Sequence, residues 1–189
     1  MQRFIFVILV NTILQSCATV SVMRPAHHLE KGQLEASAGV AVNPANVLFA
    51  AKLDYGITNK IEVGLQYETL SFMAGGRYQI FANPEGFALS LGLQTGSVVS
   101  IDDDQDGSIW VWAPNITLGW QRKTWNIYLG YKAMLDLDTY QIGSVKLGVR
   151  KQLSPRWFIG MEGGSSHYNL FDGGFSALAE GTLFGGIQF

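Results

Sequence analysis

Several features that define common classes of protein are scarce in this sequence. One cysteine among 189 residues rules out a disulfide within the chain. No apolar run approaches the roughly 20 residues that a transmembrane helix needs, and the mean hydropathy is only +0.15. Charged residues make up 15% and the net charge is −2, which argues against nucleic acid as a partner. What remains is a chain of single-domain length that is rich in glycine and poor in proline.

Apolar side chains recur at every second position along most of the chain. Leu34, Ala36, Val40 and Val42, for example, all lie on one face of an extended segment. The same period predicts ten strands, over residues 34–42, 47–55, 61–69, 76–80, 87–93, 110–120, 125–131, 145–149, 157–161 and from 175 to the end. This pattern predicts an all-β fold, an antiparallel up-and-down β-barrel of about ten strands, with eight as the alternative.

The last strand is Gly181-Thr-Leu-Phe-Gly-Gly-Ile-Gln-Phe189, and it ends on an aromatic residue. Terminal residues of soluble proteins are usually frayed and polar. This ending resembles the closing strand of bacterial outer-membrane β-barrels, whose terminal aromatic is part of the signal read by the barrel-assembly machinery. The resemblance implies a transmembrane barrel in the outer membrane, with Phe189 as an assembly signal.

Compact turns alternate with looser connections. Turn-forming residues fill 56–60, 83–86, 121–124 and 152–156, whereas the links at 71–75, 97–107, 135–139 and 165–174 are longer or looser. Outer-membrane barrels have short periplasmic turns and longer outer loops, so residues 43–46 would be a short outer loop. Because ten is an even number, both ends of the barrel domain would lie on the periplasmic side.

A soluble barrel of the lipocalin type, with its apolar face inward, has the same alternation. Aromatic placement favours the membrane barrel, because six aromatic residues flank the compact turns or the C-terminus and would form one interfacial girdle. They are Tyr55, Phe87, Trp120, Trp125, Trp157 and Phe189.

The opposite face of the strands carries charges of both signs and would line the lumen. The predicted set is Glu35, Lys52, Asp54, Glu62, Glu68, Arg77, Lys132, Lys146, Arg150, Glu162 and Glu180. Buried charges must be paired, and ten strands enclose a radius of only roughly 10 Å. We therefore expect a lumen plugged by a salt-bridge network; a narrow pore for ions or small solutes is the alternative.

The N-terminus has the organisation of a secreted lipoprotein. A basic start and a short apolar run precede Leu14-Gln-Ser-Cys17, which resembles a lipobox. The resemblance implies a signal peptide over 1–16, acylation of Cys17 with palmitate or a similar chain, a tether over 17–31 and a barrel over 32–189. The lipidated Cys17 would lie on the periplasmic side, as would Phe189. Cleavage after Ala18 by ordinary signal peptidase is the alternative.

Three acidic residues alternate in one predicted loop. Asp102, Asp104 and Asp106 precede Gly107, as at the start of a calcium loop. The twelfth position is Ala113 rather than glutamate, which excludes an EF-hand. A looser Ca²⁺ site, or divalent bridging to lipopolysaccharide phosphates, is the hypothesis; a solvated acidic loop is the alternative.

Catalytic residue types also occur together near the C-terminus. Ser165, Ser166, His167 and Asp172 would suit an acyl hydrolase acting on lipid A or phospholipid, but no motif of such enzymes is present. The pair at residues 27–28, both histidines, is weak evidence for a metal, and a solvated linker is the better interpretation.

Together these patterns predict a small barrel lipoprotein with a structural or interaction role in the cell envelope, not an enzyme. Its expected partners are outer-membrane lipids and lipopolysaccharide, the barrel-assembly machinery and the lipoprotein-sorting machinery. No cofactor is expected beyond the Ca²⁺ hypothesis.

Overall fold

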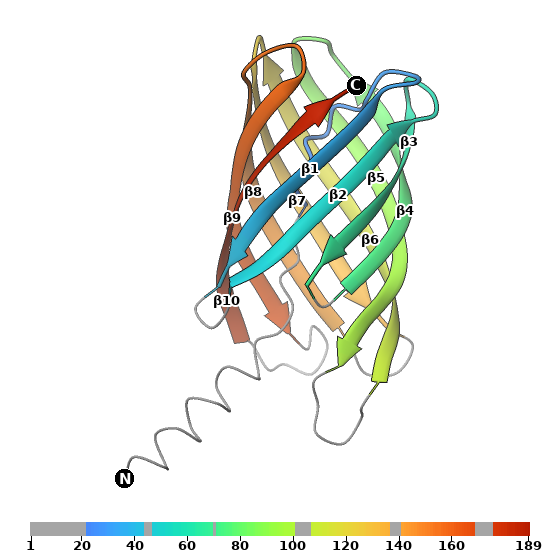
Figure 1. Ribbon diagram of the computed structural model, residues 1–189, viewed down its shortest axis with the longest axis vertical. Coiled ribbons are helices and arrows are strands. Elements are labelled where there is room, and N and C mark those ends of the chain that lie inside the picture. Colours follow the sequence, from blue (N-terminus) through green and yellow to red (C-terminus); the bar gives the residue numbers. More distant parts are fainter. Residues whose placement is uncertain (1–21, 44–46, 70, 101–106, 137–140, 169–175) are drawn as a thin grey trace.

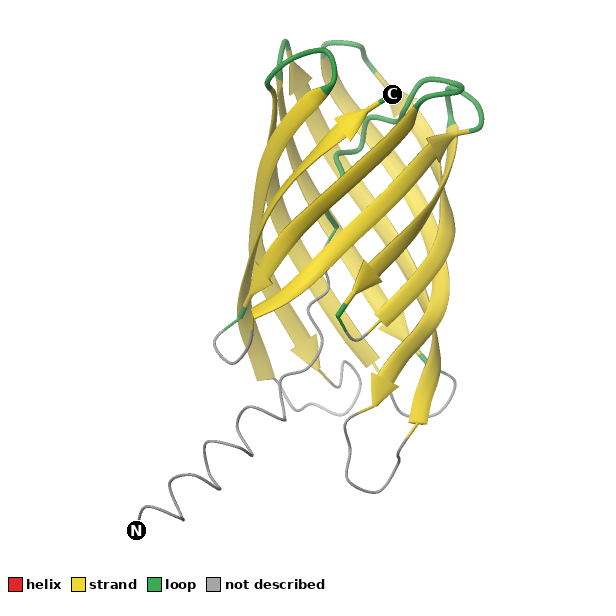
Figure 2. Ribbon diagram, viewed as in Figure 1, coloured by secondary structure: helices red, strands yellow, loops and turns green. Residues whose placement is uncertain are grey.

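Ten antiparallel strands form one closed barrel (Figure 1 and Figure 2). The computed structural model describes residues 22–43, 47–69, 71–100, 107–136, 141–168 and 176–189. The strands are β1 (Leu34–Val42), β2 (Val47–Gly56), β3 (Ile61–Glu68), β4 (Ser71–Ala82), β5 (Gly86–Ser100), β6 (Gly107–Arg122), β7 (Trp125–Leu135), β8 (Gln141–Gln152), β9 (Trp157–Tyr168) and β10 (Ser176–Gln188). The predicted ten-stranded barrel is confirmed. In the part of the chain that the structure describes, no helix is long and apolar enough to cross a bilayer.

The first and last strands close the barrel. Glu35 lies opposite Gln188, and the ladder continues to Val42 opposite Gly181. Phe189 extends this ladder, because its N–H donates to the carbonyl of Leu34 at 2.8 Å and its carbonyl accepts from the Leu34 N–H at 3.1 Å. The terminal aromatic therefore lies where the barrel closes.

The two ends of the barrel differ in their connections. Residues 57–60, 83–85, 123–124 and 153–156 join strands at one end, which we call the turn end. The connections at the other end, the loop end, are 43–46, 69–70, 101–106, 136–140 and 169–175. Phe189 lies at the turn end, because Leu34 begins β1 there.

Strands at the loop end are longer than predicted. The expected loop at 71–75 is wrong because β4 begins at Ser71, and β5 and β9 continue to Ser100 and Tyr168. Near this end both faces of the sheet are apolar: Phe72 points outward, whereas Met73 points into the lumen and is buried. The two-residue period that identifies a half-buried strand is lost there.

The outer surface of the barrel is apolar along the middle of every strand. Large apolar side chains that alternate along β2 and β3 are exposed, including Phe49, which is 66% exposed. This is the opposite of the soluble lipocalin-type alternative, whose apolar face would be inside. Of the predicted girdle at the turn end, Tyr55, Phe87, Trp125, Trp157 and Phe189 are exposed, and Trp120 is half-buried.

A second group of exposed aromatic residues lies toward the loop end, and no sequence pattern had indicated it. Its members are Phe49, Tyr67, Phe72, Trp110 and Trp112. Trp110 and Trp120 are ten positions apart on β6. At about 3.4 Å per residue and a tilt of about 40°, this separates the two girdles by roughly 26 Å along the barrel axis.

Candidate functional site

The lumen of the barrel contains the chain's own N-terminal segment. Residues 22–29 run inside the barrel, where Figure 1 shows them as a thin blue trace between the walls, whereas residues 30–32 are exposed at the turn end. Val22 to Ala26 and Leu29 are buried. The expectation of a solvated tether is therefore wrong for these residues, because the barrel wall surrounds them. We call residues 22–29 the lumen segment.

The segment enters β1 through a tight reversal at the turn end. Gly32 has φ +85°, a left-handed conformation that favours glycine. Its N–H donates to the carbonyl of Gly56 at 2.8 Å, and the Gly56 N–H donates back to Gln33 at 2.9 Å. The Lys31 N–H donates to Asn59 Oδ1 at 3.1 Å. These bonds fix the base of the segment to the β2–β3 turn.

Side chains of the barrel wall satisfy the backbone of the lumen segment. The two carboxylate oxygens of Glu162 on β9 accept the N–H groups of Val22 and Met23, each at 2.9 Å. Arg77 on β4 donates to the Pro25 carbonyl at 2.9 Å. A buried backbone without such partners would carry a large desolvation cost, so the wall is built to hold a peptide.

Arg24 is the centre of the polar contacts. It is 1% exposed, and its Nε and Nη2 donate to the two oxygens of Glu62 on β3 at 3.2 and 2.7 Å. Its Nη1 pairs with Glu35 on β1. This two-point geometry is the strong form of an arginine–carboxylate contact. Arg24 thus bridges two carboxylates that would otherwise be buried close together.

Glu35 and Glu62 extend the network around the wall. Arg150 on β8 binds both oxygens of Glu35 at 2.9 and 2.7 Å, and Gln188 on β10 adds a bond at 2.7 Å. Arg77 lies 3.1 Å from Glu62. The sequence of charges Arg150, Glu35, Arg24, Glu62, Arg77 therefore alternates in sign across the lumen.

All eleven predicted lumen charges are buried inside the barrel. Lys146 pairs with Glu180 at 2.5 Å and Lys52 with Asp54 at 3.5 Å. Glu68 accepts from Gln66 at 2.7 Å, and Lys132 lines the small cavity described below. Among the described residues the buried charges are six carboxylates and six cations, and Arg24 is the one that the segment contributes. Sequence reasoning missed Arg24 because it lies in a stretch without periodicity.

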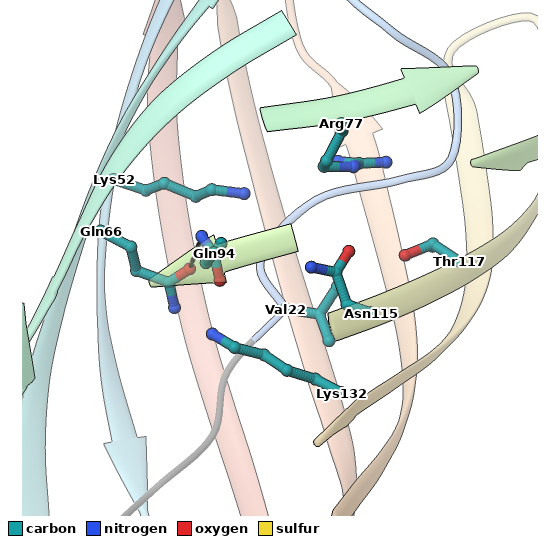
Figure 3. Close-up of a pocket in the computed structure, with 8 residues that line it drawn as sticks. All are labelled: Val22, Lys52, Gln66, Arg77, Gln94, Asn115, Thr117 and Lys132. Carbon is teal, nitrogen blue, oxygen red and sulfur yellow. Dashed lines mark hydrogen bonds between the residues drawn. The ribbon is translucent and has the colours of Figure 1, made fainter. Parts of the chain in front are cut away.

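Little space remains beside the segment in the middle of the lumen. A cavity of about 20 Å³ lies beside Val22. Lys52, Arg77 and Lys132 point into it from three strands (Figure 3). That volume is enough for about one water molecule. At the turn end a larger polar cavity of about 320 Å³ separates the segment from the β6–β7 and β8–β9 turns.

Inward-facing glycines make room for the segment. A Cβ at Gly130 would lie 3.0 Å from a methyl carbon of Val22, and one at Gly119 would lie 3.0 Å from the Cβ of Ala26. Elsewhere the wall supplies large side chains: Tyr128, Phe158 and Phe184 pack with Val22 and Met23 in one cluster. The wall is therefore shaped to the segment as well as paired with it.

The lumen changes character toward the loop end. There the walls of β4 to β8 carry a cluster of buried apolar side chains, which we call the apolar ring although it lines only these five strands: Met73, Val98, Val111, Ala113, Met134 and Ile142. The buried side chains of Gln66 and Gln94 lie opposite Met73 and Ala113 at the same level. The eleven predicted lumen charges do not include this cluster, and no pattern in the sequence indicated it. Met73, Val98, Met134 and Ile142 lie beyond the ends of the predicted strands, whereas Val111 and Ala113 fall within the predicted strand at 110–120.

The two histidines lie at the turn end beside the larger cavity. His27 Nε2 is 3.1 Å from the Asn83 carbonyl in the β4–β5 turn. Burial lowers the pKa of His28 to about 4, and the cations Arg77 and Arg24 act in the same direction, although Glu62 opposes them. His28 is therefore neutral at pH 7. Among the described residues, no three His, Cys, Asp or Glu side chains are grouped to hold a metal ion.

Other predicted sites are only partly covered by the structure. Cys17, Asp102, Asp104, Asp106 and Asp172 lie outside the described residues. Ser166 and His167 are neighbours on β9, so their side chains point to opposite faces of the sheet, with Ser166 inward. These two residues are therefore not placed to act as a nucleophile–base pair.

Comparisons with known proteins give only distant likenesses. No family model and no curated protein matches the chain. The chain is similar to the N-terminal β-barrel domain of Pseudomonas aeruginosa OprF, with 16% identity and a TM-score of 0.43 over 85% of this chain and 100% of that one. It is also similar to Ail, the attachment invasion locus protein of Yersinia pestis, with 13% identity and a TM-score of 0.35 over 84% of this chain and 99% of that one.

Proposed function

We propose that the chain is a small β-barrel of the bacterial outer membrane. Its exposed apolar surface would be costly in water and is bounded by two aromatic girdles. Their separation of roughly 26 Å matches the apolar band of about 25 Å on outer-membrane barrels. By the same pattern the turn end faces the periplasm and the loop end faces outward.

We further propose that the lumen is closed and that the barrel does not conduct ions. The observation that carries this proposal is the position of Arg24, which is buried between Glu35 and Glu62 with room for about one water molecule alongside the segment. A conducting path would require the segment to leave, and six carboxylates would then face five cations in the wall.

The role that fits a closed barrel is structural or interactive: organising the envelope and offering a small outer surface to lipids, lipopolysaccharide or a protein. The loop-end connections span at most the seven residues 169–175, so this surface is limited in size. We keep the lipid anchor at Cys17 as part of the proposal, since it is the only cysteine and follows an apolar leader. The lipoprotein-sorting and barrel-assembly machineries would be its partners during export.

Conductance in planar bilayers tests the closed lumen. The purified wild-type barrel should be silent, whereas a variant lacking residues 22–29 should open steps of measurable current. Arg122→Ala, which removes an exposed cation at the turn end, is the matched control and should remain silent. Steady conductance through the wild type would establish the narrow pore instead.

Labelling with radioactive palmitate tests the anchor separately. Wild-type protein should incorporate label, and Cys17→Ser should not. Absence of label from the wild type would favour cleavage after Ala18. The proposal of a lipid anchor would then be wrong, and the proposal of a closed barrel would be unaffected.

A further inference from the structure

The described residues of the lumen segment have a direction, and it points away from the turn end. Gly32 is bonded to Gly56 at the turn end. Ala26 faces Gly119, three positions before β6 ends at Arg122, and Val22 faces Gly130, five positions after β7 begins at Trp125. The segment therefore lies deeper in the lumen as residue number falls, and at Val22 it is well inside the barrel.

The cavity that the described residues leave beside Val22 is too small for the chain to return to the turn end from this depth. The cavity beside Val22 holds about 20 Å³, far less than a second extended chain occupies. The larger cavity of about 320 Å³ is confined to the turn end, beside residues 24–30. The path of the described residues, from Ala26 to Val22, therefore leads toward the loop end.

The side chains that line the lumen between Val22 and the loop end suit the residues that precede Val22 in the sequence. The apolar ring lies between Val22 and the loop end, and Val111 and Ala113 within it have no exposed surface. Residues 17–21 are Cys-Ala-Thr-Val-Ser, and the sequence has no charged residue from Phe4 to Met23. An uncharged stretch can occupy an apolar ring without the desolvation cost that a charged one would incur.

The chain before Val22 is also long enough to reach the loop end. From Gly130 to the end of β7 at Leu135 is five positions, or roughly 13 Å along the barrel axis at the usual rise and tilt. The five residue-to-residue steps from Cys17 to Val22 can span about 17 Å when the chain is extended. Cys17 can thus reach the rim of the loop end.

We propose that the apolar ring binds residues 17–21 of this chain, so that the mature N-terminus emerges at the loop end. This inference rests on the proposed outer-membrane barrel, in which the loop end faces the outside. It reverses the expectation that Cys17 and Phe189 share the periplasmic side: the lipid anchor would enter the outer leaflet, and the two ends of the mature chain would lie on opposite faces of the membrane.

An epitope tag placed between Ala18 and Thr19 tests this topology in intact cells. Identical tags within residues 101–106 and within residues 83–85 serve as controls for the loop end and the turn end. Antibody should reach the N-terminal tag and the 101–106 tag in intact cells, and the 83–85 tag only after permeabilisation. Ala18→Cys, probed with a membrane-impermeant maleimide against Asp104→Cys and Glu85→Cys, repeats the comparison without an insertion.

Two different results would overturn the inference, and they are distinguishable. If the N-terminal tag behaves like the 83–85 tag while both controls behave as expected, the barrel stands and the threaded N-terminus is wrong. If antibody reaches the 83–85 tag but not the 101–106 tag in intact cells, or reaches both tags equally, the proposed membrane orientation is wrong and the inference fails with it.

Discussion

Arg24 and Glu62 form a buried two-point ion pair between the lumen segment and the barrel wall, with N···O distances of 3.2 and 2.7 Å. The pair joins a stretch without secondary structure to β3, and Glu35 engages the same guanidinium from β1. A buried pair contributes little net stability over an apolar replacement, but removing one partner leaves a buried charge that is expensive. The contact therefore specifies where the segment lies more than it strengthens the barrel.

Arg24→Ala should destabilise the folded barrel by about 3–5 kcal/mol, because Glu35 and Glu62 would remain buried without their shared partner. Arg24→Lys should be intermediate, since an ammonium group cannot make the two-point contact. Urea unfolding in detergent micelles measures both. Arg122→Ala should leave the midpoint unchanged. Equal midpoints for Arg24→Ala and the wild type would show that the network does not hold the segment.

Gly130→Leu should displace the lumen segment, because even a Cβ at this position lies 3.0 Å from Val22. The expected results are increased proteolysis near residue 24 and a measurable conductance. Gly163→Leu is the matched control: Gly163 faces outward and a Cβ there would have its nearest neighbour at 3.7 Å. If the two variants behave alike, Val22 does not occupy the space beside Gly130.

The alternation of side chains explains why much of this arrangement could be predicted. A strand with one apolar and one polar face has a period of two, and that period located ten strands and the eleven wall charges. It failed where both faces are apolar, as at Phe72 and Met73. It also could not place Arg24, because nothing in a non-periodic stretch indicates that a barrel will close around it.

Stability should fall as the pH is lowered from about 6.5 to about 4. His28 has a pKa of about 4 in the folded barrel and near 6.5 when unfolded, so in this window the unfolded chain binds the extra proton. With screening by solvent in the adjacent cavity, the loss should be about 1–2 kcal/mol. His28→Asn should flatten this part of the pH profile of unfolding. An unchanged slope in that variant would assign the pH dependence to other groups.

Phe189→Ala should reduce the amount of barrel assembled in cells while leaving refolding in detergent almost unaffected. The side chain is 64% exposed, so its removal costs little packing, and the backbone bonds to Leu34 persist. Membrane fractionation measures the amount of barrel assembled in cells, and heat-modifiable migration on a gel measures refolding in detergent. Leu153→Ala, an exposed apolar change at the same end of the barrel, is the control. Normal assembly of Phe189→Ala in cells would show that Phe189 is not an assembly signal.

The most direct measurement of the segment's position is a disulfide between Val22→Cys and Gly130→Cys. A Cβ at position 130 would lie 3.5 Å from the Cβ of residue 22, at the short end of the disulfide range of about 3.5–4.5 Å. Mild oxidation of the folded barrel should therefore produce an internal crosslink, seen as a mobility shift that reducing agent reverses. The pair Val22→Cys and Gly163→Cys should give none, because Gly163 faces outward. Failure of the first pair to crosslink, with both thiols freely alkylated in the folded protein, would contradict an N-terminal segment held inside the barrel.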